Sequence, residues 1–125
     1  MSLRTALGRV KGLGSAKAGL AHWQSQRLSA LCLIPLSLWF VYALMGIVNQ
    51  PFADVVTWIR TPYVTVLLIA LVLALLRHLQ LGLQVVLEDY VHSPILQIAS
   101  QVLLRGGAGI GALIAIFSIL KIALA

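Results

Sequence analysis

Three long stretches of this chain carry almost no charge, and they constrain its fold more than any other feature. Residues 28–48 and 106–120 contain no charged side chain, and Arg77 and His78 are the only basic residues within 63–87. A helix of about 20 mostly apolar residues crosses the hydrocarbon layer of a membrane, and lipid leaves backbone groups no outside partner. We therefore expect an all-α membrane protein with three spans, over about 27–49, 62–88 and 98–124.

The composition excludes the usual soluble classes of protein. Of the 125 residues, 61% are hydrophobic and 10% are charged, and a soluble domain of this size cannot bury so much apolar surface. The spans leave room for one membrane-anchor domain, preceded by a basic interfacial segment over 1–22. The net charge of +6 gathers before the first span, so nucleic-acid binding is not expected. Cys32 is the only cysteine, which excludes a disulfide framework.

The distribution of basic residues predicts how the chain crosses the membrane. Five of the nine precede the first span: Arg4, Arg9, Lys11, Lys17 and Arg27. Because basic residues stay on the cytoplasmic side, we expect a cytoplasmic amino terminus and a periplasmic carboxyl terminus. The segment 1–20 is either a helix on the membrane surface or a loosely ordered tail. It resembles a mitochondrial transit peptide, but its retention from Met1 leads us to expect a bacterial inner-membrane protein.

Several residues mark the ends and contacts of the expected helices. We expect a short loop containing Asp54, Trp58 and Arg60 after the first span, and Pro62 opens the second helix. Small residues in the third span allow close approach of another helix. These are Gly106, Gly107, Gly109 and Gly111.

The most informative side chain is a histidine inside the second span. With the cytoplasmic end of that helix near Glu88, His78 lies about 15 Å deeper, close to the middle of a roughly 30 Å hydrocarbon layer. An ionisable group at such depth is costly and is a candidate for function. Neutral imidazole is a suitable axial ligand for haem iron, and the alternative is a structural hydrogen bond to a neighbouring helix.

Residues four and eleven positions after His78 lie near the same helix face. Gly82, one turn away, would leave room for a flat macrocycle, and Asp89 brings a carboxylate to the cytoplasmic end. Tyr90 follows directly. On the residues alone, an interfacial anchor role for Tyr90 and a topology role for Arg27 remain the simpler interpretations.

Two sequence blocks resemble a known family. The run from His78 through Gly82 to Asp89-Tyr90 is similar to the signature of succinate dehydrogenase hydrophobic membrane anchors, also called the cytochrome b556 small subunit family. The block His22-Trp23-Gln24-Ser25-Gln26-Arg27-Leu28-Ser29-Ala30 is similar to the family's pattern at the start of its first span.

The resemblance implies a role for each matching residue. His78 would be one axial ligand of a b-type haem, with the second from a sister anchor subunit, so that three helices form half of a haem-binding bundle. Tyr90 would bind a carbonyl of ubiquinone with Asp89 beside it, and Arg27 and His22 would contact the haem propionates.

The same resemblance implies partners and excludes activity of the chain by itself. The flavoprotein subunit, the iron–sulfur subunit and a second membrane anchor would complete the complex, and electrons from succinate would reach quinone. A related fumarate reductase anchor and a non-redox membrane assembly subunit are the alternatives. Arg77, next to His78, is an unusual charge within the second span, and three interpretations stay open: its side chain extends to the membrane surface, contacts a propionate or pairs with a carboxylate of another subunit.

Overall fold

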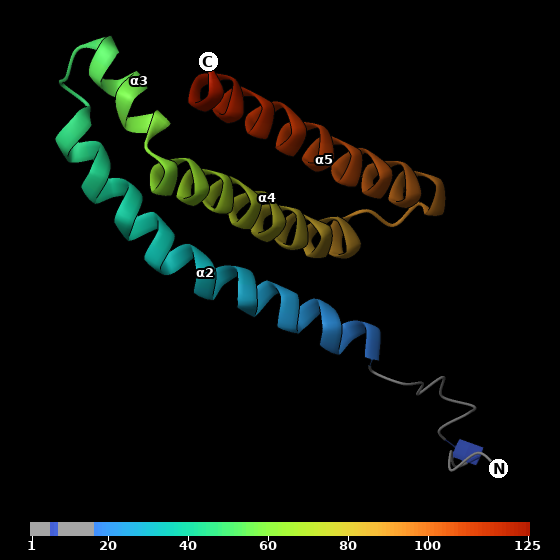
Figure 1. Ribbon diagram of the computed structural model, residues 1–125. Coiled ribbons are helices and arrows are strands. Elements are labelled where there is room, and N and C mark those ends of the chain that lie inside the picture. The colour runs from blue at the N-terminus through green and yellow to red at the C-terminus, as the bar shows by residue number, and fades with distance from the viewer. Residues whose placement is uncertain (1–5, 8–16) are drawn as a thin grey trace.

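The computed structural model describes residues 6–7 and 17–125, and four helices follow one another in the second of these ranges (Figure 1). They are α2 (Lys17–Ile47), α3 (Phe52–Arg60), α4 (Pro62–Tyr90) and α5 (Pro94–Leu124). Helices α2, α4 and α5 are each long and apolar enough to cross a membrane. The prediction of three spans is confirmed. The expected surface segment over 1–20 falls largely outside the described residues.

The helices extend beyond the predicted spans at their polar ends. α2 begins at Lys17 rather than near residue 27 and continues through Pro35, and α5 begins at Pro94 rather than near residue 98. Pro62 and Pro94 each open a helix, where the missing N–H of proline costs no hydrogen bond. The helical segments are therefore longer than the apolar stretches that reveal them.

The expected loop after the first span is wrong, because residues 52–60 form the short helix α3. Pro51 precedes its first turn, Asp54 lies in the first turn and Arg60 in the last. This distribution of charge suits the helix dipole. The indole rings of Trp58 on α3 and Trp39 on α2 stack with centroids 6.2 Å apart, and Arg60 Nε donates to the Ile122 carbonyl at 3.1 Å. These contacts join α3 to the ends of its neighbours.

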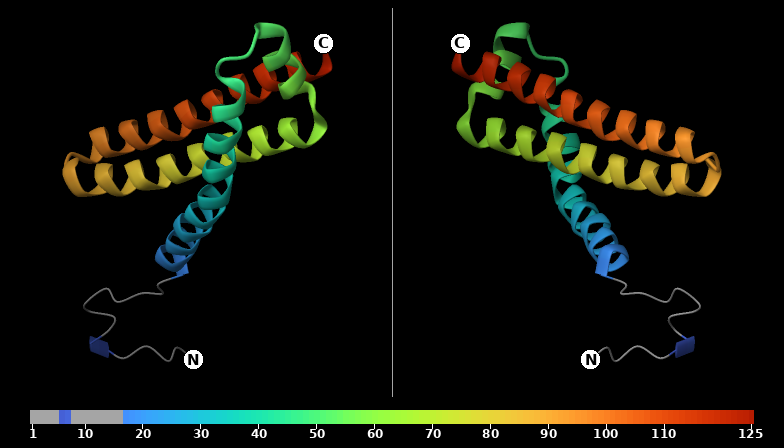
Figure 2. Two further views of the ribbon diagram at one scale, coloured as in Figure 1. Left: turned by 90° about the vertical axis from the view of Figure 1, so that its left-hand side faces the viewer. Right: turned by 90° about the vertical axis from the view of Figure 1, so that its right-hand side faces the viewer.

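α4 lies between the other two long helices. It packs against α2 on one side and, after the turn at residues 91–93, against α5 on the other. Figure 2 shows α4 and α5 side by side as an antiparallel hairpin, with α2 lying obliquely across it. A side chain on α4 can therefore reach either neighbour, depending on its position around the helix.

Few side chains are buried within the part of the chain that the structure describes. Val64, Leu68 and Leu81 on α4 and Ser29 on α2 are the buried ones. Gly111 lies 4.0 Å, measured from an ideal Cβ, from Leu76 Cδ1, whereas the glycines at 106, 107 and 109 have no such neighbour. Within the described residues, Gly111 is the glycine of this group that faces α4, at an ordinary contact distance, and most apolar side chains are exposed on the outer surface of the helices.

The less exposed positions of α2 include a series separated alternately by four and three residues, a spacing that puts them on one face of the helix. We call this series, which begins at His22, the α2 seam. The residues are His22, Gln26, Ser29, Leu33, Leu36, Phe40, Ala43 and Ile47. The α2 seam is thus polar in its first three positions and apolar in the others.

Packing around α4 predicts unequal effects for two valines one half-turn apart. Val64 is fully buried and Val66 is 65% exposed. We expect Val64→Ala to lower the stability of the purified protein by about 1–2 kcal/mol, because two buried methyl groups are lost. Val66→Ala is the matched control and should have less than half that effect. Thermal midpoints in one detergent measure both, and equal losses would contradict this account of the packing.

Candidate functional site

His78 on α4 is held by a hydrogen bond to Ser29 in the α2 seam. The Ser29 Oγ lies 3.0 Å from His78 Nδ1 and donates to the Gln26 carbonyl at 2.8 Å. A serine hydroxyl has one hydrogen, so with that hydrogen on the carbonyl, Nδ1 is the donor to Oγ. This network assigns the proton to Nδ1 and leaves the lone pair on Nε2. Metal-binding histidines typically have this arrangement, in which the second nitrogen fixes the ring.

The polar part of the α2 seam contains side-chain atoms without a partner. His22 Nε2 and Gln26 Oε1 are shielded from solvent, and neither has a hydrogen-bond partner among the described residues. An ideal Cβ on Gly82 would lie 3.8 Å from Gln26 Nε2, so Gly82 faces this side chain at ordinary contact distance. Buried polar atoms without partners are costly. The seam therefore has unused capacity to bind a further polar group beside His78.

His78 lies near the middle of α4, two residues past the midpoint of Pro62–Tyr90. Its partner Ser29 is the second residue of the uncharged stretch 28–48, and the uncharged part of α4 ends at Leu76. His78 is thus just past the uncharged part of α4 but well inside the candidate span, and its depth in the membrane stays a prediction.

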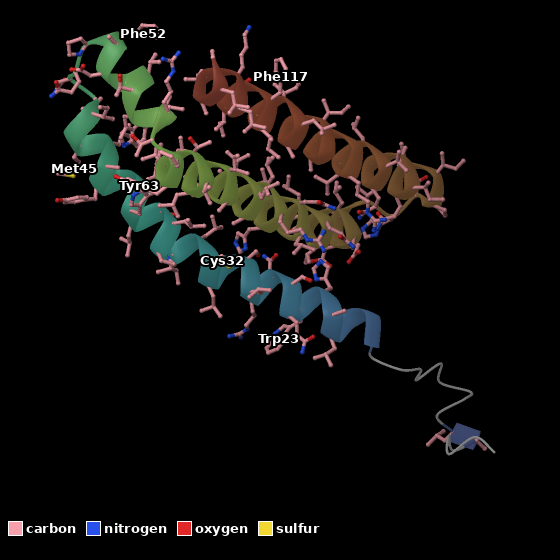
Figure 3. The ribbon with its side chains drawn as sticks, in the orientation of Figure 1. Trp23, Cys32, Met45, Phe52, Tyr63 and Phe117 are labelled. Atoms are coloured by element: carbon pink, nitrogen blue, oxygen red, sulfur yellow. The ribbon has the colours of Figure 1, made fainter. Side chains whose placement is uncertain are left out.

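Arg27 does not approach His78 within this chain. It is two positions before Ser29, about 200° around the helix, and is exposed. Its Cζ lies 4.8 Å from the centroid of the Trp23 ring, a cation–π contact on the outer face of α2 (Figure 3 labels Trp23). Of the two residues matched to the start of the first span, His22 lies in the α2 seam and Arg27 faces outward.

Asp89 and Tyr90 are the last two residues of α4. Both are exposed, Tyr90 by 79%. The preceding acid, Glu88, accepts a hydrogen bond from Gln84 Nε2 at 3.1 Å. Eleven and twelve residues of helix separate the pair from His78, about 16–18 Å. The structure therefore puts the pair at the polar end of α4, apart from the histidine and accessible to another molecule.

The site contains residues to which the sequence analysis gave no role. Ser29 belongs to the quoted block, and its spacing of seven residues from His22 puts both on one helix face, a signal that could have been used. Arg77 and Arg105 line one cavity with His22, a proximity that depends on the packing of three helices. In the described ranges, no three histidine, cysteine or acidic side chains gather as a metal site.

Comparison with known proteins gives one consistent family. The family described as Succinate dehydrogenase/Fumarate reductase transmembrane subunit matches residues 1–120. The succinate dehydrogenase hydrophobic membrane anchor subunit of Rickettsia bellii is 35% identical over 88 residues, 70% of each chain. The protein of the same name in Rickettsia conorii is 34% identical over 84 residues, 66% of this chain and 67% of the relative.

No solved structure matches the chain. The family match covers nearly all of the sequence, and the three apolar helices agree with a multi-pass transmembrane subunit. The chain belongs to the family of succinate dehydrogenase/fumarate reductase transmembrane subunits.

Proposed function

We propose that this chain is the non-catalytic membrane anchor of a succinate dehydrogenase in a bacterial inner membrane. It would dock the flavoprotein and iron–sulfur subunits and share a b-type haem and a ubiquinone site with a second anchor. The names of the curated relatives support the complex, and the basic residues before the first apolar stretch support a cytoplasmic amino terminus and periplasmic carboxyl terminus.

The observation that carries the haem proposal is the hydrogen bond between Ser29 Oγ and His78 Nδ1. It fixes the ring and leaves Nε2 as the donor atom that iron requires, and the second axial ligand would come from the sister anchor. A bound haem supplies one-electron transfer. The role of this chain is to hold the imidazole in one tautomer and orientation while its apolar helices exclude water.

Other residues fit the surroundings of the same haem. His22 Nε2 has no partner and can donate to a carboxylate, so His22 suits a propionate contact. Arg27 would take the same role only for a propionate that reaches the outer face of α2, where the sister subunit would pack. Gly82 on α4 faces Gln26 of the α2 seam, and the proposal includes a place for Gly82 beside the haem.

Asp89 and Tyr90 provide the groups that a quinone site needs. A phenol hydroxyl can donate to a quinone carbonyl, and a carboxylate beside it can orient that hydroxyl or deliver protons from water. Both side chains are exposed at the polar end of α4, where protons are available. The rest of the pocket would be supplied by partner subunits that cover this end.

Removing the proposed ligand should remove the haem signal. We expect His78→Ala to abolish or strongly shift the b-type absorption of the purified complex, because the iron loses one axial donor. His92, exposed in the turn after α4, gives the matched control His92→Ala, which should keep the spectrum. Absorption spectra of the reduced complex measure the effect. An unchanged spectrum in His78→Ala would remove the ligand assignment.

The Ser29 contact predicts a subtler effect. Ser29→Ala should lower haem affinity by roughly tenfold and raise the haem midpoint potential, because an imidazole that loses its Nδ1 acceptor donates less strongly to iron. Ser29→Thr retains the hydroxyl and should restore both values. Redox titration and haem content measure them. A role in packing alone predicts equal losses for both variants with no change in potential.

The quinone role is tested at Tyr90. We expect Tyr90→Phe to lower the rate of quinone reduction by about tenfold, since one hydrogen bond to the substrate is lost. Succinate oxidation with an artificial acceptor that bypasses the quinone should be unaffected. Tyr63, 61% exposed at the other end of α4, gives the control Tyr63→Phe. Parallel loss of both activities in Tyr90→Phe, or loss of neither, would contradict the assignment.

A further inference from the structure

A basic cavity lies where the three long helices meet. It has a volume of about 440 Å³ and receives side chains from α2, α4 and α5. The residues lining it are Ala21, His22, Ser25, Arg77, Gln80, Leu81, Gln84 and Arg105. Two guanidinium groups, an imidazole, two amides and a hydroxyl therefore face one space, and none of its lining residues is acidic. Such a lining selects an anion.

The cavity lies at the boundary between the polar and apolar parts of the helices. Arg77 follows the uncharged stretch of α4, and Arg105 precedes that of α5. The turn at residues 91–93 joins the two helices, and Arg77 lies about four helical turns before it and Arg105 just over three turns after it. An arginine next to an apolar stretch can extend its long side chain toward the headgroups, where its charge is attracted to anionic lipid.

An apolar cavity adjoins the basic one. It has a volume of about 320 Å³, shares Ser25 and Arg77 with the first cavity, and otherwise lies between α2 and α4. Its remaining lining consists of Leu28, Ser29, Cys32, Leu73 and Ala74. These residues belong to the uncharged parts of both helices, so the second cavity leads from the arginines toward the hydrocarbon layer.

The two guanidinium groups suit a phosphate, which has several acceptor oxygens. His78 lines neither cavity, because it is about 100° around α4 from Arg77 and faces Ser29. The basic cavity is thus separate from the proposed iron ligand.

We propose that these two cavities form a binding site for an anionic phospholipid, with the phosphate between Arg77 and Arg105 and one acyl chain between α2 and α4. The apolar cavity favours a lipid over a carboxylate side chain from another subunit, since such a side chain would satisfy the arginines and leave the groove unfilled. Binding of a haem propionate is a separate outcome of the test. The proposal needs only that the chain spans a membrane, and it gives Arg77 a role independent of the haem.

The experiment uses the intact complex, purified in detergent and stripped of lipid. Native mass spectrometry measures binding of dioleoyl phosphatidylglycerol and of dioleoyl phosphatidylcholine, which share acyl chains and differ in net charge. The natural complex should bind phosphatidylglycerol in preference. Arg77→Gln with Arg105→Gln should weaken that binding at least tenfold, because two cations near the phosphate are lost. Arg77→Lys with Arg105→Lys should retain most of it.

Two further variants test whether the position of the charges and the open space of the apolar cavity matter for lipid binding. Arg60→Gln with Lys121→Gln also removes two charges, but at the other end of the helices, and should leave binding unchanged. Ala74→Phe keeps every charge and fills the apolar cavity, so it should weaken binding of phosphatidylglycerol.

Four outcomes would overturn the proposal. The first is equal affinity of the natural complex for the two lipids, and the second is equal loss in the Arg60 and Lys121 control. The third is loss of haem absorption from the Arg77 and Arg105 variant with lipid binding intact, which would assign the cavity to a propionate. The fourth is loss of a subunit from that variant with lipid binding intact, which would assign the cavity to a partner's carboxylate.

Discussion

A polar side chain between two helices in lipid must find its hydrogen-bond partner on those helices, because the surrounding hydrocarbon offers none. This constraint governs the contact between α2 and α4. The apolar part of the α2 seam can rely on packing alone. In the polar part, Ser29 bonds to its own helix through the Gln26 carbonyl and to α4 through His78. The bond therefore fixes how the two helices align at this level.

The same bond determines what His78 can do. A histidine that rotated freely would present either nitrogen, and its donor atom would be undefined. With Nδ1 directed to Ser29, Nε2 is the nitrogen whose lone pair is free. The ring loses its rotational freedom when the helices pack, before any ligand binds. The partnerless atoms of His22 and Gln26 belong to the same seam. These two atoms can form hydrogen bonds to a further group beside the oriented His78 ring.

The sequence was sufficient to predict the three membrane spans, because a long uncharged stretch has few alternatives to a membrane helix. It did not predict α3, whose position depends on Trp39 and on the end of α5, residues distant in the sequence. The resemblance gave His22 and Arg27 one role, and the structure separates them onto different faces of α2. Spacing around a helix distinguishes such faces, but the direction of the partner helix is known only from the packing.

Different faces of α4 contact different neighbours. Toward α2 it presents His78, with Gly82 allowing the approach of Gln26, and about 100° away it presents Arg77 to the basic cavity. The rotation of about 100° per residue directs Arg77 away from the His78 face and toward the cavity that Arg105 also lines. Two adjacent residues can thus act independently because helix geometry turns them toward different neighbours. The packing of α2 and α5 on α4 determines which side chains surround His78 and which surround Arg77.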